Sequence, residues 1–306
     1  MSTVNSAGDA AASDQSASLT DRCKVLPQYL IPQHGLSRLL YVLTRCTFKA
    51  GKNAGIRWFI QHYNVDMSIA EQSDPGAYPH FNAFFTRALK TGARPIDPDP
   101  SQFVSPVDGS VSQCGDIKHD RLFQAKGHDY TLHDLLAGDS ALADKFRNGT
   151  FATLYLSPRD YHRIHMPLNG RVLRQIYVPG RLFAVNTHTA RVVPRLFARN
   201  ERVILEFESP SGPFVLILVG ALNVGSMETI WTGQVTPASV RQIRTWTFSQ
   251  DDPTTAIERG AEVGRFNMGS TVILLAPPGS LNWRSELTPG KAIRMGETLG
   301  RLVQAP

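Results

Sequence analysis

Short β-rich runs succeed one another from Phe103 onward, and they constrain the fold more than any other feature of the chain. Each run stands between turns rich in Gly, Pro and Asn. The clearest runs are Gly149–Leu156, Gly170–Val178, Arg202–Phe207, Phe214–Val219 and Thr271–Leu275. Short runs of apolar and β-branched residues bounded by turn-forming residues are typical of strands. We therefore predict an α+β fold with a β-rich domain of short strands at 76–306 and one helical turn at Thr131–Leu136.

The preceding segment, 23–75, follows a helical pattern. Its apolar side chains recur three and four positions apart, which places them on one face of a helix. They are Leu36, Leu39, Leu40 and Leu43 in a first stretch, and Ile56, Phe59, Ile60 and Tyr63, with Trp58 nearby, in a second. Gly51 and Gly55 predict a break around these positions. Residues 1–22 are small and polar, and their composition predicts a disordered tail.

The excess positive charge of the chain is concentrated in these predicted helices. The net charge is +6, from 32 Lys and Arg against 26 Asp and Glu. Between Cys23 and Val65 there is no acidic residue, and the basic ones are Lys24, Arg38, Arg45, Lys49, Lys52 and Arg57. Without these six, the basic residues equal the acidic ones. A neutral body with one basic segment indicates contact with an anionic surface at one place, and it disfavours nucleic acid as the partner.

Two interpretations of the helical segment stay open on periodicity alone. A helix with leucines and aromatics on one face and Lys or Arg elsewhere is typical of the membrane interface. Any pair of surface helices packed on the body would show the same periodicity. The absence of acidic residues favours the membrane, because a solvated face usually mixes charges of both signs.

Composition and cysteine spacing exclude several other classes. The chain has no run of about 18 uninterrupted apolar residues, so no transmembrane helix is expected. The N-terminus lacks the features of a signal peptide, and it is too acidic and too poor in Arg for a transit peptide. Cys23, Cys46 and Cys114 show neither CxxC nor Cys/His metal spacing, which indicates a reducing compartment without disulfides or a zinc module.

Polar residues interrupt the strand-like sequence at three places that can carry chemistry. Asp108 lies between a Pro-Val pair and a Gly, where a turn would present its carboxylate, although a turn-capping role would explain it as well. His162 and His165 stand three apart, and a histidine there can serve as a general base or acid. We expect no metal, because no third ligand is placed to complete a site. Gly269 and Ser270 lead directly into an apolar strand.

A hydroxyl that follows a glycine can attack the glycine carbonyl if a base lies nearby. Asp108, His165 and Ser270 supply an Asp/His/Ser set. Spacing alone leaves two other interpretations open. One is a hydrolase in which Ser270 stays intact and attacks an external ester. The other is a β-rich carrier module without enzymatic activity, which would need a lysine at an exposed hairpin tip that Asn267–Ser270 does not offer.

The chain resembles the phosphatidylserine decarboxylases, which are pyruvoyl-dependent enzymes, and in particular their bacterial type. The resemblance begins near Leu26 and covers nearly everything after the first 25 residues. It rests on the segments Lys52–Asp66, Phe84–Asp97, Val104–Gly109, Lys126–Leu136, Tyr155–Gly170, Pro179–Asn186, Leu196–Val203 and the region around Ser270. The cleavage motif of the family is usually Leu-Gly-Ser-Thr, and Met268 replaces its leucine here. That exchange conserves volume and apolarity, and the Gly-Ser bond is intact.

The resemblance implies a proenzyme that cuts itself between Gly269 and Ser270, which gives a large chain, 1–269, and a small chain, 270–306. It implies that His165 deprotonates Ser270 and that Asp108 orients the imidazole. Ser270 would become a pyruvoyl cofactor, whose ketone forms a Schiff base with the substrate amine and accepts electrons during decarboxylation.

The activity so implied converts phosphatidylserine to phosphatidylethanolamine and CO2 in phospholipid biosynthesis. His162 would donate a proton or position the carboxylate, and Tyr155 would line the same pocket. The expected partners are phosphatidylserine, an anionic membrane surface and a second copy in a homodimer. The expected location is peripheral, on the cytoplasmic side of a bacterial cell membrane.

Overall fold

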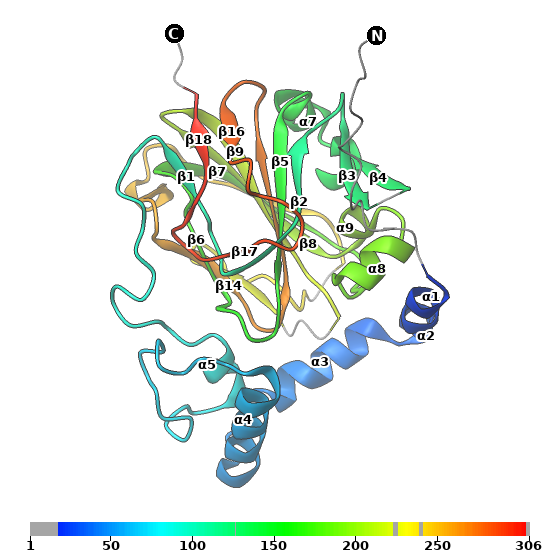
Figure 1. Cartoon of the computed structure of the whole chain (residues 1–306), viewed down its shortest axis with the longest axis vertical. Coiled ribbons are helices and arrows are strands. Elements are labelled where there is room, and N and C mark those ends of the chain that lie inside the picture. The colour runs from blue at the N-terminus through cyan, green and yellow to red at the C-terminus, as the bar shows by residue number, and fades with distance from the viewer. Residues whose placement is uncertain (1–17, 126, 223–225, 239–240, 304–306) are drawn as a thin grey trace, which may run out of the picture.

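The computed structural model of the chain describes residues 18–125, 127–222, 226–238 and 241–303 (Figure 1). It contains a β-rich body and a group of helices formed by the N-terminal part of the described residues. The predicted α+β class, with short strands and N-terminal helices, is confirmed.

The N-terminal helices begin inside the segment predicted as a tail. They are α1 (Leu19–Val25), α2 (Pro27–Leu30), α3 (Gln33–Leu43), α4 (Lys49–Tyr63) and α5 (Phe81–Phe85). Ser18 and Asp21 form a capping box in which each side chain accepts the other's backbone N–H, which starts α1 at Leu19. The remainder of the predicted tail that precedes Ser18 lies outside the described residues.

The predicted break at Gly51 and Gly55 is wrong, because α4 runs through both glycines. The chain turns earlier, between the end of α3 and Phe48. A helical glycine costs about 1 kcal/mol relative to alanine, which is less than the gain from burying Ile56 and Phe59 on the same helix. A side chain at Gly51 would also press on the Phe48 ring, since a Cβ there would lie 3.1 Å from it.

One large antiparallel sheet forms the centre of the body. Its strands, in spatial order, are β12 (Arg244–Thr247), β7 (Gly170–Val178), β8 (Arg202–Ser209), β9 (Gly212–Val219), β15 (Ser270–Ala276), β5 (Thr150–Leu156), β2 (Gly109–Asp116) and β17 (Ala292–Ile293), and β13 (Ala256–Ile257) also pairs with β7. The predicted strands are therefore confirmed to within a few residues at their ends. β15 pairs with β9 on one side and β5 on the other, and all seven of its residues are buried.

Smaller elements surround this sheet. A second sheet contains β11 (Gly233–Gln234), β10 (Met227–Thr229), β14 (Glu262–Phe266) and β6 (Arg163–His165), and a third contains β1 (Gln102–Val104), β18 (Thr298–Leu302) and β16 (Leu281–Trp283). β3 (Arg121–Ala125) and β4 (His128–Thr131) form a hairpin. The remaining helices are α6 (Leu132–Leu135), α7 (Ser140–Phe146), α8 (Thr187–Val192), α9 (Leu196–Arg199) and the 3-10 turn η1 (Pro253–Thr255). The helical turn predicted at Thr131–Leu136 is confirmed as α6.

Polar side chains attach the first helices to the body. Gln33 accepts a hydrogen bond from the Leu182 N–H at 2.9 Å, and Gln28 accepts one from the Ala184 N–H at 2.8 Å. Both glutamines are buried. Figure 1 shows α3 running from the region of α1 and α8 down to α4 and α5. The glutamines satisfy backbone N–H groups that would otherwise be buried without partners.

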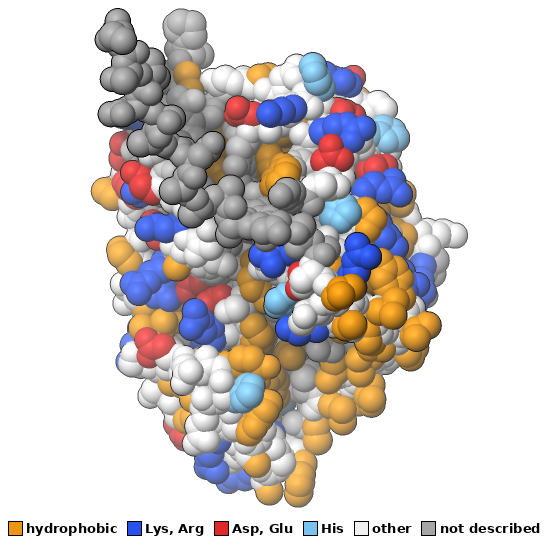
Figure 2. Space-filling view, turned by 45° about the vertical axis from the view of Figure 1, so that its right-hand side comes forward, with side chains coloured by type: hydrophobic (Ala, Val, Ile, Leu, Met, Phe, Trp, Pro, Cys, Tyr) orange, Lys and Arg blue, Asp and Glu red, His pale blue; other side chains and the backbone are white. Residues whose placement is uncertain are grey.

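An amphipathic helix on a water-soluble body usually buries its apolar side, but α3 buries polar residues instead. Its buried residues are Gln33 and Ser37, whereas Leu39 and Leu43 of its predicted apolar face are exposed and Leu36 and Leu40 are half-buried. The large apolar side chains left exposed on the first four helices and the α3–α4 turn are Leu19, Leu26, Tyr29, Leu30, Leu39, Val42, Leu43, Phe48 and Trp58. Figure 2 shows hydrophobic side chains gathered on the lower right of one face of the molecule.

Candidate active site

Ser270 occupies the first position of β15, in the middle of the large sheet. Its backbone pairs with Leu156 of β5, and its side chain is fully buried. The hydroxyl Oγ has no hydrogen-bond partner among the described residues. A buried hydroxyl without a partner is destabilising by about 1–3 kcal/mol. Such a group in a well-packed sheet is a candidate for chemistry.

The preceding residue, Gly269, lies against a histidine. A Cβ built on Gly269 would stand 3.7 Å from His162 Nε2 and 3.4 Å from the Leu156 carbonyl oxygen. The structure therefore brings His162 next to the Gly269–Ser270 bond, with no side chain of residue 269 between them.

His162 is completely buried, between strands β5 and β6. Its Nδ1 lies 2.8 Å from the Asp160 carbonyl oxygen, which only accepts, so Nδ1 carries the proton. Its Nε2 is then an unprotonated nitrogen, and it has no partner in the described part of the chain. The Phe85 ring packs 4.2 Å away, centroid to centroid. Burial lowers the pKa of His162 to about 3, so the ring is neutral at neutral pH.

His165 is also buried, but both of its ring nitrogens are engaged. Nδ1 lies 2.7 Å from the Gly260 carbonyl oxygen and must donate to it. Nε2 lies 3.0 Å from the Tyr161 hydroxyl and accepts from it. Burial lowers the pKa of His165 and keeps it neutral with a basic Nε2.

Asp108 is held by partners other than a histidine. Its carboxylate accepts a bidentate pair of hydrogen bonds from Arg94, at 2.8 Å to Oδ1 and 2.5 Å to Oδ2. The Met295 N–H donates to the same carboxylate at 2.9 Å. Among the described residues, no hydrogen bond joins Asp108 to His165, or either of them to Ser270. The structure thus brings His162 to the bond, and it places Asp108 and His165 in separate hydrogen-bond networks.

Tyr155 lies on β5 opposite Thr271, one residue along from the Leu156–Ser270 pair. It is partly buried, and this burial raises the pKa of its phenol. Because neighbouring residues of a strand point to opposite faces, Tyr155 shares a face with Thr271, and its predicted place in the lining of the Ser270 pocket stays a prediction.

Two asparagines that sequence reasoning missed hold the turn before the bond. Asn82 Nδ2 donates to Asn267 Oδ1 at 2.8 Å, and Asn267 Nδ2 donates to Glu228 at 2.7 Å and to the Ser226 hydroxyl. The Asn267 N–H also donates to the Ser226 carbonyl at 2.8 Å. Asn267 is fully buried. The one signal in the sequence is a polar residue between two apolar ones just before the Gly-Ser pair.

An apolar groove of about 440 Å³ reaches the same turn. Met268 lines it, together with Leu40 and Leu43 of α3 and with Trp58 and Phe59 of α4. The groove therefore connects the residue before Gly269 to the exposed apolar surface of the helices.

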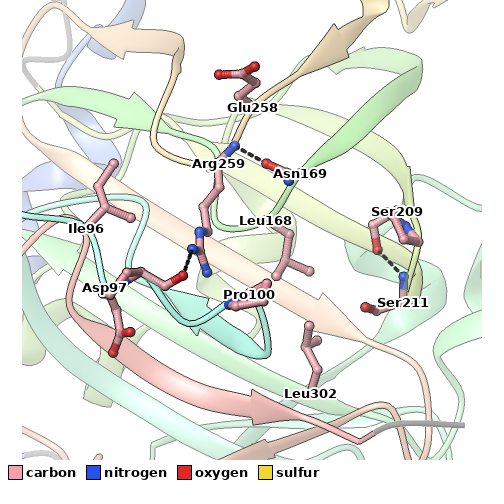
Figure 3. Close-up of a pocket in the computed structure, with 12 residues that line it drawn as sticks. Ile96, Asp97, Pro100, Leu168, Asn169, Ser209, Ser211, Glu258, Arg259 and Leu302 are labelled. Atoms are coloured by element: carbon pink, nitrogen blue, oxygen red, sulfur yellow. Dashed lines mark hydrogen bonds between the residues drawn. The ribbon is translucent and has the colours of Figure 1, made fainter.

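A separate polar pocket of about 550 Å³ includes none of these residues. Figure 3 shows the Arg259 guanidinium beside Asp97, with a dashed hydrogen bond to an adjoining oxygen. That guanidinium donates to the carbonyl oxygens of Pro98, Asp99 and Gln102. Arg259 thus ties the 97–102 segment to the body, which is a structural role.

Comparison with known proteins supplies the remaining observation. The family model described as phosphatidylserine decarboxylase matches residues 81–301, and a second model, described as PSD, matches residues 23–64. The chain belongs to the phosphatidylserine decarboxylase family. The resemblance stated from the sequence is thereby confirmed.

Curated relatives in this family match over nearly their whole length. A phosphatidylserine decarboxylase proenzyme of Pseudomonas fluorescens is 53% identical over 282 residues, which cover 91% of this chain and 97% of the relative. The proenzyme of Pseudomonas putida is 50% identical over 288 residues, covering 94% and 100%. That of Stutzerimonas stutzeri is 50% identical over 286 residues, covering 92% and 95%.

The two family matches separate the first helices of this decarboxylase chain from its β-rich body. The match at 23–64 contains the last residues of α1, Cys23–Val25, and all of α2, α3 and α4, and the match at 81–301 contains α5 and the strands of the body up to Arg301 of β18. The helices that expose their apolar faces are therefore part of the phosphatidylserine decarboxylase family pattern.

Proposed function

We propose that this chain is a self-processing, pyruvoyl-dependent decarboxylase that converts phosphatidylserine to phosphatidylethanolamine and CO2 at a membrane surface. The observation that carries the proposal is the buried, unpartnered Ser270 hydroxyl at a Gly-Ser bond that abuts His162. Membership of the family and the proenzyme names of the relatives support it.

Self-cleavage begins with attack of Ser270 Oγ on the Gly269 carbonyl carbon. The peptide C–N bond breaks, and an ester joins Gly269 to the Ser270 side chain while the Ser270 nitrogen becomes an amine. Loss of the Ser270 Cα proton then expels the Gly269 carboxylate and leaves a dehydroalanine. Water converts that residue to a ketone and releases ammonia. The products are a large chain, 1–269, and a small chain, 270–306, with a pyruvoyl group at its start.

For the first step we assign the base to His165 and its support to Asp108, as the family resemblance implies. His165 Nε2 already accepts a hydrogen bond from the Tyr161 hydroxyl. Ser270 has to replace that hydroxyl, so cleavage requires a shift of the turn that Asn267 holds. Asp108, fixed by Arg94, then contributes the negative charge that stabilises the imidazolium.

The site fits a pyruvoyl group at position 270. Oγ of Ser270 leaves with the Gly269 carboxylate, so the ketone oxygen stands on Cα in place of the former Ser270 nitrogen, and His162 Nε2 lies beside this new chain end. When present, this group supplies a ketone that binds the substrate amine and takes up the electron pair released with CO2. Nε2 of the neutral, buried His162 carries no proton in the uncut chain. The negative substrate carboxylate favours its protonation, after which His162 can hold that carboxylate and pass the proton to the substrate Cα. Tyr155 lines the same pocket.

The orientation of α3 supports the proposal that the enzyme acts at a membrane surface. The helix buries Gln33 and Ser37 and exposes leucines, which is the reverse of a helix packed for water. A lipid interface accepts such a face, and nearby Lys and Arg add about 1 kcal/mol each on an anionic membrane. In the described residues, no helix has both the length and the apolar character needed to span a bilayer. The proposed location is peripheral, on the cytoplasmic face of the cell membrane, and a homodimer is the expected assembly.

Intact-mass spectrometry of the purified protein, with Ser270→Ala beside the wild type, tests the proposal. The wild type should yield a small chain of residues 270–306, about 4 kDa by its share of the 33.8 kDa total, with a blocked, ketone-bearing N-terminus. The variant should stay whole. A single uncut chain in folded, wild-type protein would instead favour a hydrolase that keeps Ser270 as its nucleophile.

A further inference from the structure

A second pocket, of about 540 Å³, lies beside the start of β2 and the connection from β5 to β6. Four arginines line it: Arg87, Arg94, Arg159 and Arg294. Arg94 belongs to the Asp108 ion pair described above. The other three have no role in the proposed chemistry.

Arg87 is the unusual member of this group. Only 4% of the residue is exposed, and its Nε has no hydrogen-bond partner within the described part of the chain. One terminal nitrogen reaches the Arg159 carbonyl oxygen at 3.4 Å. No carboxylate of the described residues lies within ion-pair distance of it. Burial lowers the pKa of Arg87, because desolvation disfavours its charge more than the nearby carboxylates favour it.

The carboxylates in the pocket are already bound elsewhere. Asp108 is held by Arg94, and Asp160 accepts from the Ser157 N–H and hydroxyl at 2.7 Å each. Asp160 comes no closer than 4.0 Å to Arg159. Asp66 accepts from the N–H and hydroxyl of Ser68. The Ser157 and Ser68 donors cancel no charge, so the lining sets four arginines against three carboxylates and keeps one positive charge in excess, and none of these carboxylates pairs with Arg87 directly.

We propose that this pocket binds a phosphate-type oxyanion, with Arg87 as the buried donor and Arg159 and Arg294 at its mouth. A guanidinium presents paired N–H groups in a fork that matches two oxygens of a phosphate. An anion there would supply the counter-charge that Arg87 lacks. Arg159 and Arg294 are exposed, which leaves the mouth of the pocket accessible from solvent.

The location of the pocket favours a lipid head group as the source of the anion. Ser157, in its lining, directly follows Leu156, which pairs with Ser270. Asn64 and Asp66, also in the lining, follow the end of α4, the helix that exposes Trp58. The assignment of the pocket to a lipid head group rests on the proposed function. The assignment to an oxyanion does not depend on the proposed function.

Calorimetric titration of the full-length protein with inorganic phosphate and with glycerophosphoserine tests the inference. Arg159→Gln combined with Arg294→Gln should weaken binding at least tenfold, since both side chains are exposed and can be replaced without disturbing the core. Arg87→Lys keeps the charge but loses the fork, and it should weaken binding as well. Arg147→Gln, an exposed arginine paired with Asp144 on α7, is the matched control and should bind as the wild type does.

The kinetics of phosphatidylserine dispersed in neutral detergent distinguish the two sources. For a head-group site, the double variant should raise KM at least fivefold with kcat nearly unchanged. For a free phosphate site, phosphate binding should depend on the arginines while KM stays at the wild-type value. Equal binding of both anions to wild type, Arg87→Lys and the double variant would overturn the inference. Intact mass on the same samples reports self-cleavage separately, so a failure of the proposed function is recognised independently.

Discussion

His162 presents an unpartnered Nε2 to Gly269, 3.7 Å from the position that a Cβ on that glycine would take. His165, three residues later, is engaged at both ring nitrogens. The two histidines are close in the chain, but only His162 has a ring nitrogen without a hydrogen-bond partner among the described residues. This difference separates the two halves of the proposed chemistry and makes them individually testable.

The two histidines should affect different steps. His165→Ala should leave the chain uncut, whereas His162→Ala should be cut normally and lose at least 100-fold in decarboxylation rate, the usual scale for general acid–base catalysis. Intact mass measures the first effect, and release of CO2 from phosphatidylserine measures the second. His133→Ala, on an exposed position of α6, is the control. If His162→Ala blocks the cut, the neighbouring imidazole is the base, and the assignment of His165 is wrong.

Tyr161 should compete with Ser270 for His165. Tyr161→Phe removes the hydroxyl that donates to Nε2, so self-cleavage should proceed at the wild-type rate or faster. A time course of the cut after rapid refolding provides the measurement. A slower cut would show that the hydroxyl takes part in the step instead of opposing it.

Acid should destabilise the uncut protein through His162. Its pKa in the folded state is about 3, below the ordinary value of 6.5, so below about pH 6.5 the unfolded state binds a proton that the folded state does not. The free energy of unfolding should therefore decrease as the pH is lowered from about 6.5 to about 3. This group contributes at most about 1.4 kcal/mol per pH unit to that decrease. Urea unfolding of Ser270→Ala at several pH values measures the slope. Adding His162→Gln should reduce it, and an unchanged slope would contradict the prediction.

Asn267 should matter for both stability and cleavage. Asn267→Ala leaves the amide of Asn82 without its partner and removes a hydrogen-bond donor from the carboxylate of Glu228, which should lower the free energy of unfolding by about 1–3 kcal/mol. The cut should also slow, because the turn before Gly269 loses its anchor. Thermal unfolding and intact mass provide the readouts. Asn282→Ala, exposed on β16, should change neither.

Binding to anionic vesicles should depend on the exposed face of the first helices. Arg38→Glu with Arg57→Glu should weaken sedimentation with phosphatidylserine-containing vesicles at least tenfold, since each basic residue contributes about 1 kcal/mol. Leu39→Ser with Leu43→Ser should weaken it by loss of apolar contact. Arg45 is unsuitable for this test because it also approaches Glu228 at 3.6 Å. Unchanged sedimentation of both variants would refute the membrane role.

The strands of the body were predictable because each is a buried apolar run between turn-forming residues. β15 is the clearest case, since both faces of the strand are covered and its sequence shows no alternation. The Gly269–Ser270 pair was predictable as a site only through the family resemblance, because one Gly-Ser pair at a strand entrance resembles any other.

The contacts around the site were not predictable, because they join residues far apart in the chain. The ion pair of Arg94 with Asp108 and the clamp of Asn82 on Asn267 depend on the tertiary arrangement of loops. The orientation of α3 depends on backbone groups near Leu182, which the periodicity of the helix does not contain. Periodicity revealed the two faces of that helix and left open which one is buried.

The position of β15 between β9 and β5 has a consequence for how such an enzyme is made. The proposed cut before Ser270 would leave the small chain held in the body, since β15, β17 and β18 are each hydrogen-bonded to strands that precede the cut. The precursor folds as one molecule, whereas the cut product, once unfolded, would have to find its partner by collision. Under the proposed mechanism, activation would therefore be a one-way step taken by the folded precursor, and a cut enzyme that unfolds would lose its activity permanently.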